Sequence, residues 1–468
     1  MSSYSEIMAR RNEIIRSSTR FDYEQFEQYG LAFDYEAMMQ NTGYSHEQIR
    51  DIQHNTGVGS TPLLELRNIT KLARQVSPRG RGARIFIKDE AANPSGSFKA
   101  RRAAVSVYHA QRYGFRGVAA ATSGNYGAAV ASQAAMLGLK CIIVQEVFDS
   151  QGLGQPEIIE KGRACEAYGA EVVQLTVGPE LFAVYLQILA ETGYFNASLY
   201  TPFGIAGIET LGSELAEQVS ANTGGPPDVV VVTHAGGGNI TGTARGLRLA
   251  GASKTQVVAA SVDLSGLHMA SDVDFNRKSF TTGHTGFGMP FATWPDRADV
   301  PRNAARALRY MDRYVTVSQG EVFYATEMLA QLEGLERGPA GNTALAAAFV
   351  LAQEMDDSQT IVVQETEYTG AGKHPNAQLA FARERGVVVS SGDPRQSRPG
   401  ETIIIPDHPA RMGVHEVELN HLRRSYLRNA LNAKGHNVLE PIEREFLLAD
   451  SRADETLLTE VQQSFVRR

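Results

Sequence analysis

Cysteine is almost missing from this chain of 468 residues, which contains only Cys141 and Cys165. Two cysteines cannot build a disulfide scaffold or a four-cysteine metal site, and such sparse use is typical of a reducing compartment. Cys141 lies in an apolar run, and Cys165 lies in the helical segment KGRACEAYGA without a neighbouring histidine. We therefore expect both thiols to pack in the core rather than to act as nucleophiles.

Long hydrophobic runs and an excess of positive charge are also missing. No uncharged apolar run reaches the roughly 18 residues that a membrane span requires, and the start, MSSYSEIMARRNEIIR, lacks the apolar core of a signal peptide. Asp plus Glu outnumber Lys plus Arg by 52 to 45, so the net charge of −7 does not favour nucleic-acid binding. We expect a cytoplasmic protein that binds neither membranes nor nucleic acid.

Motifs for metal binding are missing as well. His-Glu-x-x-His does not occur, and His415 and His421 do not have the i, i+4 spacing of a helical zinc pair. The sequence therefore predicts no metal site.

The residues that are present describe a globular α/β protein. Hydrophobic residues make up 43% and charged residues 21%, and the length suits two or three structural units. Short apolar runs alternate with alanine-rich segments of helical length; the runs are residues 85–87, 117–121, 139–144, 171–175, 229–232, 257–262 and 360–363. This alternation predicts two lobes, each with a twisted, mainly parallel sheet covered by helices.

The chain divides into four expected parts. Residues 1–59 form an N-terminal arm, in which Ser45 to Gln48 make a capping box that begins a short helix. Residues 60–205 and 206–395 form the two lobes. Residues 396–468, where the alternation weakens, form a C-terminal extension that ends in charged helices.

The first candidate site loop is NPSGSFK, residues 93–99. Pro94 and Gly96 mark a turn, Ser97 is expected to cap the following helix, and Lys99 falls in the first helical turn. The positive end of the helix dipole disfavours the protonated amine there, and a lysine with a lowered pKa suits a Schiff base to an aldehyde cofactor. On this segment alone, an ordinary solvated lysine is the commoner case.

The second candidate loop follows the apolar run 117–121 and precedes an alanine-rich helix. Thr122, Ser123, Gly124, Asn125 and Tyr126 place hydroxyls, an amide and a glycine at a helix N-terminus. Such a turn can bind an anion such as a substrate carboxylate. A plain strand-to-helix turn, capped by Asn or Ser, is equally compatible with the segment.

The third candidate loop, Gly236, Gly237, Gly238 and Asn239, follows the run 229–232. Successive glycines let backbone N–H groups surround a phosphate that the next helix dipole also favours. The Gly-Lys-Ser/Thr ending of a nucleotide-binding P-loop is absent, and the dinucleotide spacing Gly-x-Gly-x-x-Gly is not met. A single phosphate on a small cofactor fits this loop better than a nucleotide.

Lysine, carboxylate loop and phosphate loop in this order form one constellation. In these segments the chain resembles the fold type II pyridoxal-phosphate enzymes, which include tryptophan synthase β subunit, cysteine synthase, threonine synthase and the serine and threonine dehydratases. The resemblance implies that Lys99 attaches the cofactor, that Asn125 faces its O3′ and that Gly236–Asn239 bind its phosphate. In TEYTGAGK it places Thr369 opposite the pyridine nitrogen; a plain turn residue is the alternative.

Longer stretches, among them IFIKDEAANPSGSFKARRAA and SFTTGHTGFGMPFATWPDR, resemble the β subunits of coenzyme A-dependent thiolases within this family. The resemblance covers residues 1–425. It implies cleavage of 2-amino-4-oxopentanoate with coenzyme A to acetyl-CoA and alanine in ornithine degradation. It also implies a smaller α subunit as partner and homodimerisation of this chain within a hetero-oligomer.

Activation of the coenzyme A thiol is not assigned by this resemblance. The candidates for this role are His284, Thr285 and Tyr126. For His284, a structural loop histidine is the alternative interpretation. Arg101 and Arg102 are among the basic residues available for coenzyme A phosphates, and we assign none of them.

Two other functions remain open on the sequence. A β-elimination or replacement enzyme, such as a threonine synthase, a dehydratase or a diaminopropionate ammonia-lyase, would share all three loops. A subunit that binds the cofactor only as a scaffold would not need Lys99.

Overall fold

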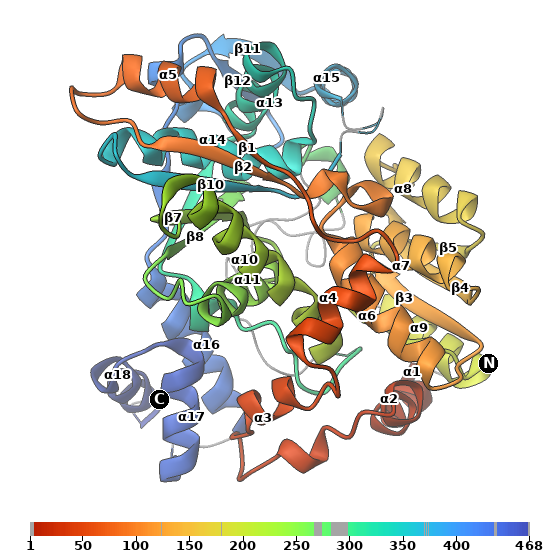
Figure 1. Ribbon diagram of the computed structural model, residues 1–468. Helices are drawn as coiled ribbons and strands as arrows, with labels where there is room; N and C mark the ends of the chain where they lie inside the picture. The colour runs from red at the N-terminus through yellow and green to blue at the C-terminus, as the bar shows by residue number, and fades with distance from the viewer. Residues whose placement is uncertain are drawn as a thin grey trace.

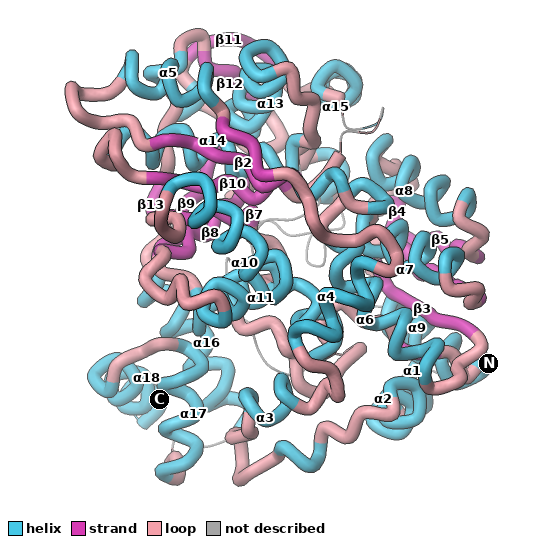
Figure 2. The backbone as a smooth tube through the Cα atoms, in the orientation of Figure 1, coloured by secondary structure: helices cyan, strands magenta, loops and turns pink. Residues whose placement is uncertain are grey.

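The computed structural model describes residues 4–122, 124–178, 180–265, 274–281, 298–368, 370, 372, 374–434 and 438–466. Its strands gather in two main groups, with helices around each (Figures 1 and 2). The predicted α/β class with two mainly parallel sheets is confirmed.

The larger sheet has seven strands in the order β1-β2-β10-β7-β8-β9-β13. The five inner strands are parallel and the two edge strands, β1 and β13, are antiparallel to their neighbours. In sheet order the strands are Leu63–Glu65, Arg84–Asp89, Thr360–Glu365, Val229–Thr233, Gln256–Val262, Arg313–Val317 and His415–Glu416.

Helices cover this sheet on both faces. Val229 and Val231 of β7 pack in one hydrophobic core with α14 (Pro339–Glu354), whereas Val230 and Val232 pack in another with α10 (Pro202–Thr223) and α11 (Gly238–Leu249). Successive side chains of a strand point to opposite faces, so a strand covered twice is apolar at every position. The continuous run of valines in β7 has this cause.

The smaller sheet has the order β5-β4-β3-β6, and all its strands are parallel. In sheet order they are Glu171–Thr176, Lys140–Phe148, Gly117–Thr122 and Phe195–Asn196. Four helices belong to this lobe: α6 (Lys99–Arg112), α7 (Asn125–Met136), α8 (Pro156–Ala167) and α9 (Glu180–Thr192). They lie around the sheet on the right of Figure 1.

Close packing fixes α10 against two neighbouring helices, α11 and α6. A Cβ added to Gly212 of α10 would lie 2.1 Å from the carbonyl oxygen of Thr243 on α11, and one added to Gly246 would lie 2.0 Å from that of Glu209. Only glycine permits this approach of two backbones. Because α10 also packs against α6, it holds α6 beside the larger sheet.

The two ends of the chain pack together. The N-terminal arm contains α1 (Tyr4–Ala9), α2 (Arg11–Thr19), α3 (Tyr35–Gln40) and α4 (His46–His54), and the capping box at Ser45 is confirmed. The C-terminal region contains α16 (Leu419–Lys434), α17 (Pro441–Ser451) and α18 (Glu455–Val466). The backbone N–H of Leu31 donates to Glu443 at 3.0 Å, and the Phe33 and Phe446 ring centroids are 5.1 Å apart.

The remaining elements lie over the larger lobe. They are α5 (Arg67–Val76), α12 (Ala307–Tyr310), α13 (Gln319–Glu333), α15 (Pro375–Glu384) and a parallel strand pair, β11 (Val388–Gly392) with β12 (Thr402–Pro406). Strands β1 and β2, which precede residue 100, join the larger sheet, whereas the smaller sheet lies within residues 117–196. The domain ranges given above stay a prediction.

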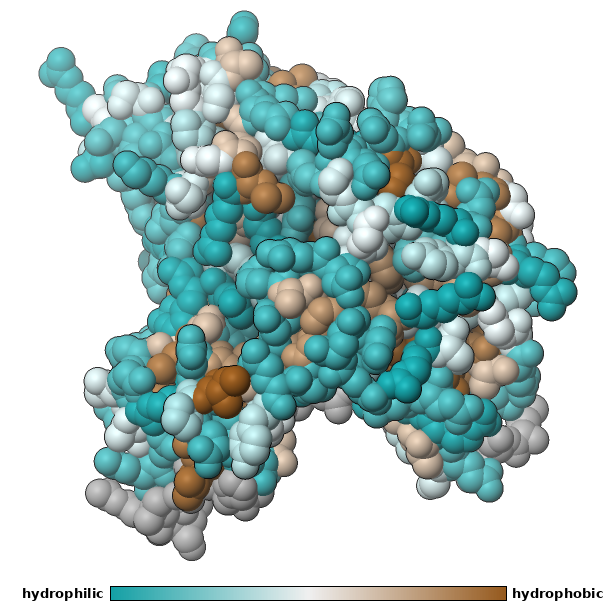
Figure 3. Space-filling model, turned by 60° about the horizontal axis from the view of Figure 1, so that its bottom comes forward, coloured by the Kyte–Doolittle hydropathy of each residue, from teal (hydrophilic) through white to brown (hydrophobic). Residues whose placement is uncertain are grey.

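One face of the molecule is mainly polar (Figure 3). Figure 3 shows one face on which hydrophilic residues dominate and hydrophobic residues form separate patches. Among the helices of the described ranges, none is long and apolar enough to cross a membrane.

Candidate functional site

Four loops converge because each follows a parallel strand at its carboxyl end, the edge where ligands bind in α/β sheets. The Lys99 loop follows β2, the Thr122 loop follows β3, the Gly236 loop follows β7, and residues 366–368 follow β10. The first and last of these are paired directly. Phe98 N–H donates to the Thr366 carbonyl at 3.0 Å, and Tyr368 N–H donates to the Gly96 carbonyl at 2.7 Å.

Lys99 is the first residue of α6, as the sequence predicts, and its side chain is half-buried. The turn before it needs two left-handed residues, Ser95 at φ 64° and Gly96 at φ 70°. A Cβ on Gly96 would also lie 3.1 Å from the Cβ of Tyr368. Glycine is therefore favoured where the lysine loop meets the loop after β10.

The predicted capping by Ser97 is wrong. The N-cap of α6 is Phe98, which makes no side-chain cap hydrogen bond, and the buried Ser97 hydroxyl has no partner in the described part of the chain. The Ser97 backbone is extended and bridges Glu367, so it belongs to the short pairing with the β10 loop rather than to the helix.

The predicted carboxylate loop is tightly bent. The Thr122 hydroxyl accepts hydrogen bonds from the N–H groups of Gly124 at 3.1 Å and Gly127 at 3.3 Å. This closes the turn onto the N-terminus of α7, where the helix dipole favours an anion. Ser123 lies outside the described residues. Tyr126 is buried in the core of the smaller lobe, and burial raises the pKa of its hydroxyl, which is therefore neutral.

Two glutamates that the sequence analysis did not single out, Glu365 and Glu367, lie at the end of β10 and in the loop after it, and Glu367 contacts Asn125. The Asn125 amide nitrogen donates to the carboxylate of Glu367, which is buried. Glu365, fully buried, has its pKa raised well above its ordinary value by burial and by the neighbouring Glu367. This shift favours the protonated form of Glu365. The sequence feature that could have indicated these two glutamates is the acidic segment QETE at the end of a buried strand.

The glycine loop forms a cradle at the N-terminus of α11. Gly237 has φ 81°, and a Cβ there would lie 2.8 Å from the Cβ of Ala307. Asn239 is only 7% exposed, and both polar atoms of its amide lack partners within the described ranges. Buried amides are normally satisfied, so an unpartnered one beside a helix N-terminus fits a phosphate group. The residues present thus fit the phosphate of pyridoxal phosphate.

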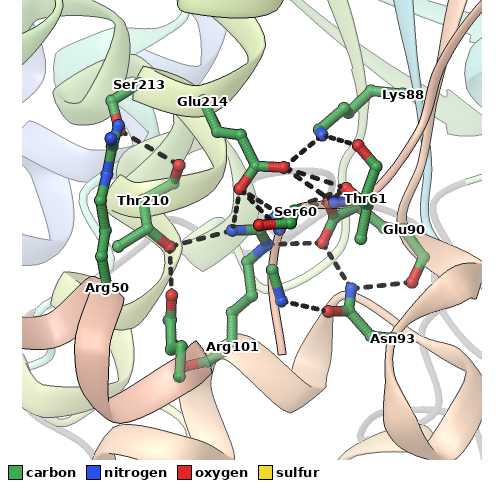
Figure 4. A network of polar contacts seen from close by, with 12 residues as sticks. Arg50, Ser60, Thr61, Lys88, Glu90, Asn93, Arg101, Thr210, Ser213 and Glu214 are labelled. Atoms are coloured by element: carbon green, nitrogen blue, oxygen red, sulfur yellow. Dashed lines mark hydrogen bonds and ion pairs between the residues drawn. The ribbon is translucent and has the colours of Figure 1, made fainter. Parts of the chain in front are cut away.

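A buried ionic network fixes α6 behind the lysine (Figure 4). Arg101 and Glu90 are fully buried and bonded at 2.7 and 2.8 Å, and Arg101 also donates to Glu214 on α10 at 3.1 Å. Glu214 accepts as well from Lys88 of β2 at 2.5 Å. Because Arg101 stands two residues from Lys99, the network anchors the lysine loop to both β2 and α10.

Thr369 and His284 lie outside the described residues. Cys141 and Cys165 are both buried; burial raises the pKa of the Cys141 thiol strongly and that of Cys165 to about 12. Such thiols are not nucleophiles at neutral pH. Within the described ranges no group of three or more His, Cys, Asp or Glu could hold a metal ion.

Comparisons with known proteins agree with this geometry. The family model "Pyridoxal-phosphate dependent enzyme" matches residues 54–367. Two curated relatives are named 2-amino-4-ketopentanoate thiolase beta subunit. The relative from Acetoanaerobium sticklandii is 66% identical over 97% of this chain and 96% of its own length. The relative from an unknown prokaryotic organism is 65% identical over 98% of this chain and 97% of its own length.

A solved structure supports the fold. Serine racemase from Dictyostelium discoideum matches with a TM-score of 0.52 and 20% identity over 70% of this chain and 98% of that chain. The predictions of a fold type II enzyme and of pyridoxal phosphate as cofactor are confirmed. By its family model, its relatives and its fold, the chain belongs to the pyridoxal-phosphate dependent enzymes.

Proposed function

We propose that this chain is the catalytic β subunit of a thiolase that cleaves 2-amino-4-ketopentanoate with coenzyme A to acetyl-CoA and alanine. The observation that carries this proposal is the 65–66% identity to two proteins of that name over nearly the whole chain. The site supports it, since the lysine, carboxylate and phosphate loops meet at one edge of the sheets. An elimination or replacement enzyme has the same loops but lacks this full-length similarity.

Each residue has a proposed task. Lys99 attaches the cofactor and, once released, moves the proton at the substrate Cα. The Thr122–Tyr126 loop, including Ser123, binds the substrate carboxylate, and Asn125, held by Glu367, also faces the cofactor. Gly236, Gly237, Gly238 and Asn239 hold the phosphate. Thr369 beside the pyridine nitrogen and His284 beside the substrate are proposed from the resemblance alone.

The bond changes follow from the substrate. The cofactor, when bound, withdraws electrons from the substrate carbons. The coenzyme A thiolate attacks the C4 carbonyl carbon and the C3–C4 bond breaks, so the acetyl group leaves as acetyl-CoA. C3 takes up a proton, and the remaining three-carbon amino acid is alanine. The acyl group passes directly to coenzyme A, so the two buried protein thiols are not required.

We also propose a partner. The word "beta" in the relatives' names implies a partner α subunit. We expect this α subunit to be the smaller chain, and we expect the present chain to form homodimers within the complex. The cytoplasm is its proposed location.

Product analysis tests the function. The purified chain, with and without the α subunit, is incubated with 2-amino-4-ketopentanoate and coenzyme A, and acetyl-CoA and alanine are quantified. Equal amounts of both products, lost in Lys99→Ala with assembly intact, support the proposal. Ammonia with a keto acid, or a new substituted amino acid, would instead identify the elimination or replacement enzyme. Unchanged turnover in Lys99→Ala would identify a scaffold.

A further inference from the structure

Arg102 is a buried cation without a counter-ion among the residues that the structure describes. It lies on α6 one turn after Lys99 and is 2% exposed. Its guanidinium donates to the Leu199 carbonyl at 3.2 Å, its Nε has no partner, and it forms no ion pair with any residue in the described part of the chain. By contrast, the adjacent Arg101 is neutralised by Glu90 and Glu214, and the buried Arg306 lies 3.4 Å from Asp450.

The Arg102 guanidinium lies against the phosphate cradle. A Cβ added to Gly238, the first residue of α11, would lie 2.2 Å from Nη2 of Arg102. The cation therefore stands at the N-terminus of α11, which is itself the positive end of the helix dipole. The next residue is Asn239, whose buried amide has no hydrogen-bond partner in the described ranges.

Two positive groups buried together repel each other, and burial also lowers the pKa of Arg102. Such an arrangement is costly unless an anion lies between the groups. A phosphate monoester is suited to this position, because a guanidinium and backbone N–H groups both donate to phosphate oxygens.

We propose that Arg102 binds the phosphate of pyridoxal phosphate and neutralises its charge. The inference rests on the cofactor and not on the thiolase reaction. The aldehyde and the phosphate-bearing arm are attached to neighbouring ring carbons of this cofactor. Residues three apart share one face of a helix, so α6 holds the cofactor at its aldehyde through Lys99 and at its phosphate through Arg102.

The test compares two ligands that differ only in the phosphate. Dissociation constants for pyridoxal phosphate and for pyridoxal are measured by absorbance titration of the cofactor-free chain, in the wild type and in Arg102→Met. Methionine keeps the buried length without the charge. We expect the affinity for pyridoxal phosphate to fall by about 10- to 100-fold, while the affinity for pyridoxal changes less than about 3-fold.

A matched control lies on the same helix. Arg112 is exposed near the end of α6, so Arg112→Met is expected to bind both ligands like the wild type. If the methionine variant does not fold, as judged by circular dichroism, Arg102→Gln is measured against the same criterion. Equal loss of both ligands, or unchanged affinity for pyridoxal phosphate, would overturn the proposal. Failure of the wild type to bind pyridoxal phosphate would instead remove the cofactor assignment itself.

Discussion

Glu214 offers the sharpest test of the buried ionic network. Burial alone would raise the pKa of this carboxyl, but Arg101 and Lys88 outweigh burial and lower the pKa from 4.5 to about 2. The difference between these two pKa values corresponds to about 3 kcal/mol. Since the Glu214 side chain is 17% exposed, little of this is lost to solvent screening. We predict that Glu214→Gln lowers the free energy of unfolding by about 3 kcal/mol at pH 7.

The pH dependence of this loss has a definite sign. A lowered carboxyl pKa stabilises the folded state fully above pH 4.5, and the contribution declines as the pH falls from 4.5 towards 2. The difference in the free energy of unfolding between wild type and Glu214→Gln should therefore become smaller as the pH falls below 4.5. Urea unfolding, followed by circular dichroism at several pH values, measures this difference.

A control variant on the same helix separates the effect of burial from the effect of removing a charge. Glu217 of α10 also pairs with an arginine, Arg50, but its side chain is 53% exposed. Glu217→Gln should cost less than about 1 kcal/mol. Equal losses in Glu214→Gln and Glu217→Gln, or a loss in Glu214→Gln that does not change with pH, would refute the reasoning.

Three further predictions concern other parts of the molecule. Burial raises the pKa of Glu146 to about 7, so the folded state keeps a proton that the unfolded chain releases. The free energy of unfolding should therefore fall by up to about 3 kcal/mol between pH 4.5 and 7. Urea unfolding of Glu146→Gln should not show this decline. Gly212→Ala would push α10 away from α11 and should lower the free energy of unfolding by about 1 to 3 kcal/mol, as measured by thermal unfolding. Gly225 has open space around it, so Gly225→Ala should lower this free energy only slightly. Equal losses in the two variants would contradict the close packing. Native protein should not react with a thiol reagent, and urea should expose both Cys141 and Cys165; rapid labelling of either thiol in the native protein would contradict their burial.

The alternation of strands and helices could be predicted from local sequence because the strands are covered on both faces. Every position of β10 is buried, as is every position of β7 except Thr233, so each strand contains a short apolar run. The partners of each strand could not be predicted in this way. β2 pairs with β10, which lies far along the chain, and no local pattern encodes a parallel register between distant segments.

The placement of the candidate loops was predictable where it depends on the local backbone. Lys99 at a helix start and Gly236–Asn239 before α11 depend on turns and helix termini, which neighbouring residues determine. Arg102 was not predictable, because its importance depends on Gly238 reaching it from another lobe. The capping prediction for Ser97 is wrong for the same reason, since its segment pairs with the distant Glu367.

The central claim is that Lys99 carries pyridoxal phosphate, and one measurement tests it most directly. The purified chain is incubated with the cofactor, its visible absorbance is recorded, borohydride is added, and the labelled lysine is mapped by mass spectrometry. We predict a visible band that disappears on reduction and a pyridoxyl group on Lys99. No band, or a pyridoxyl group on a different lysine, would contradict the account.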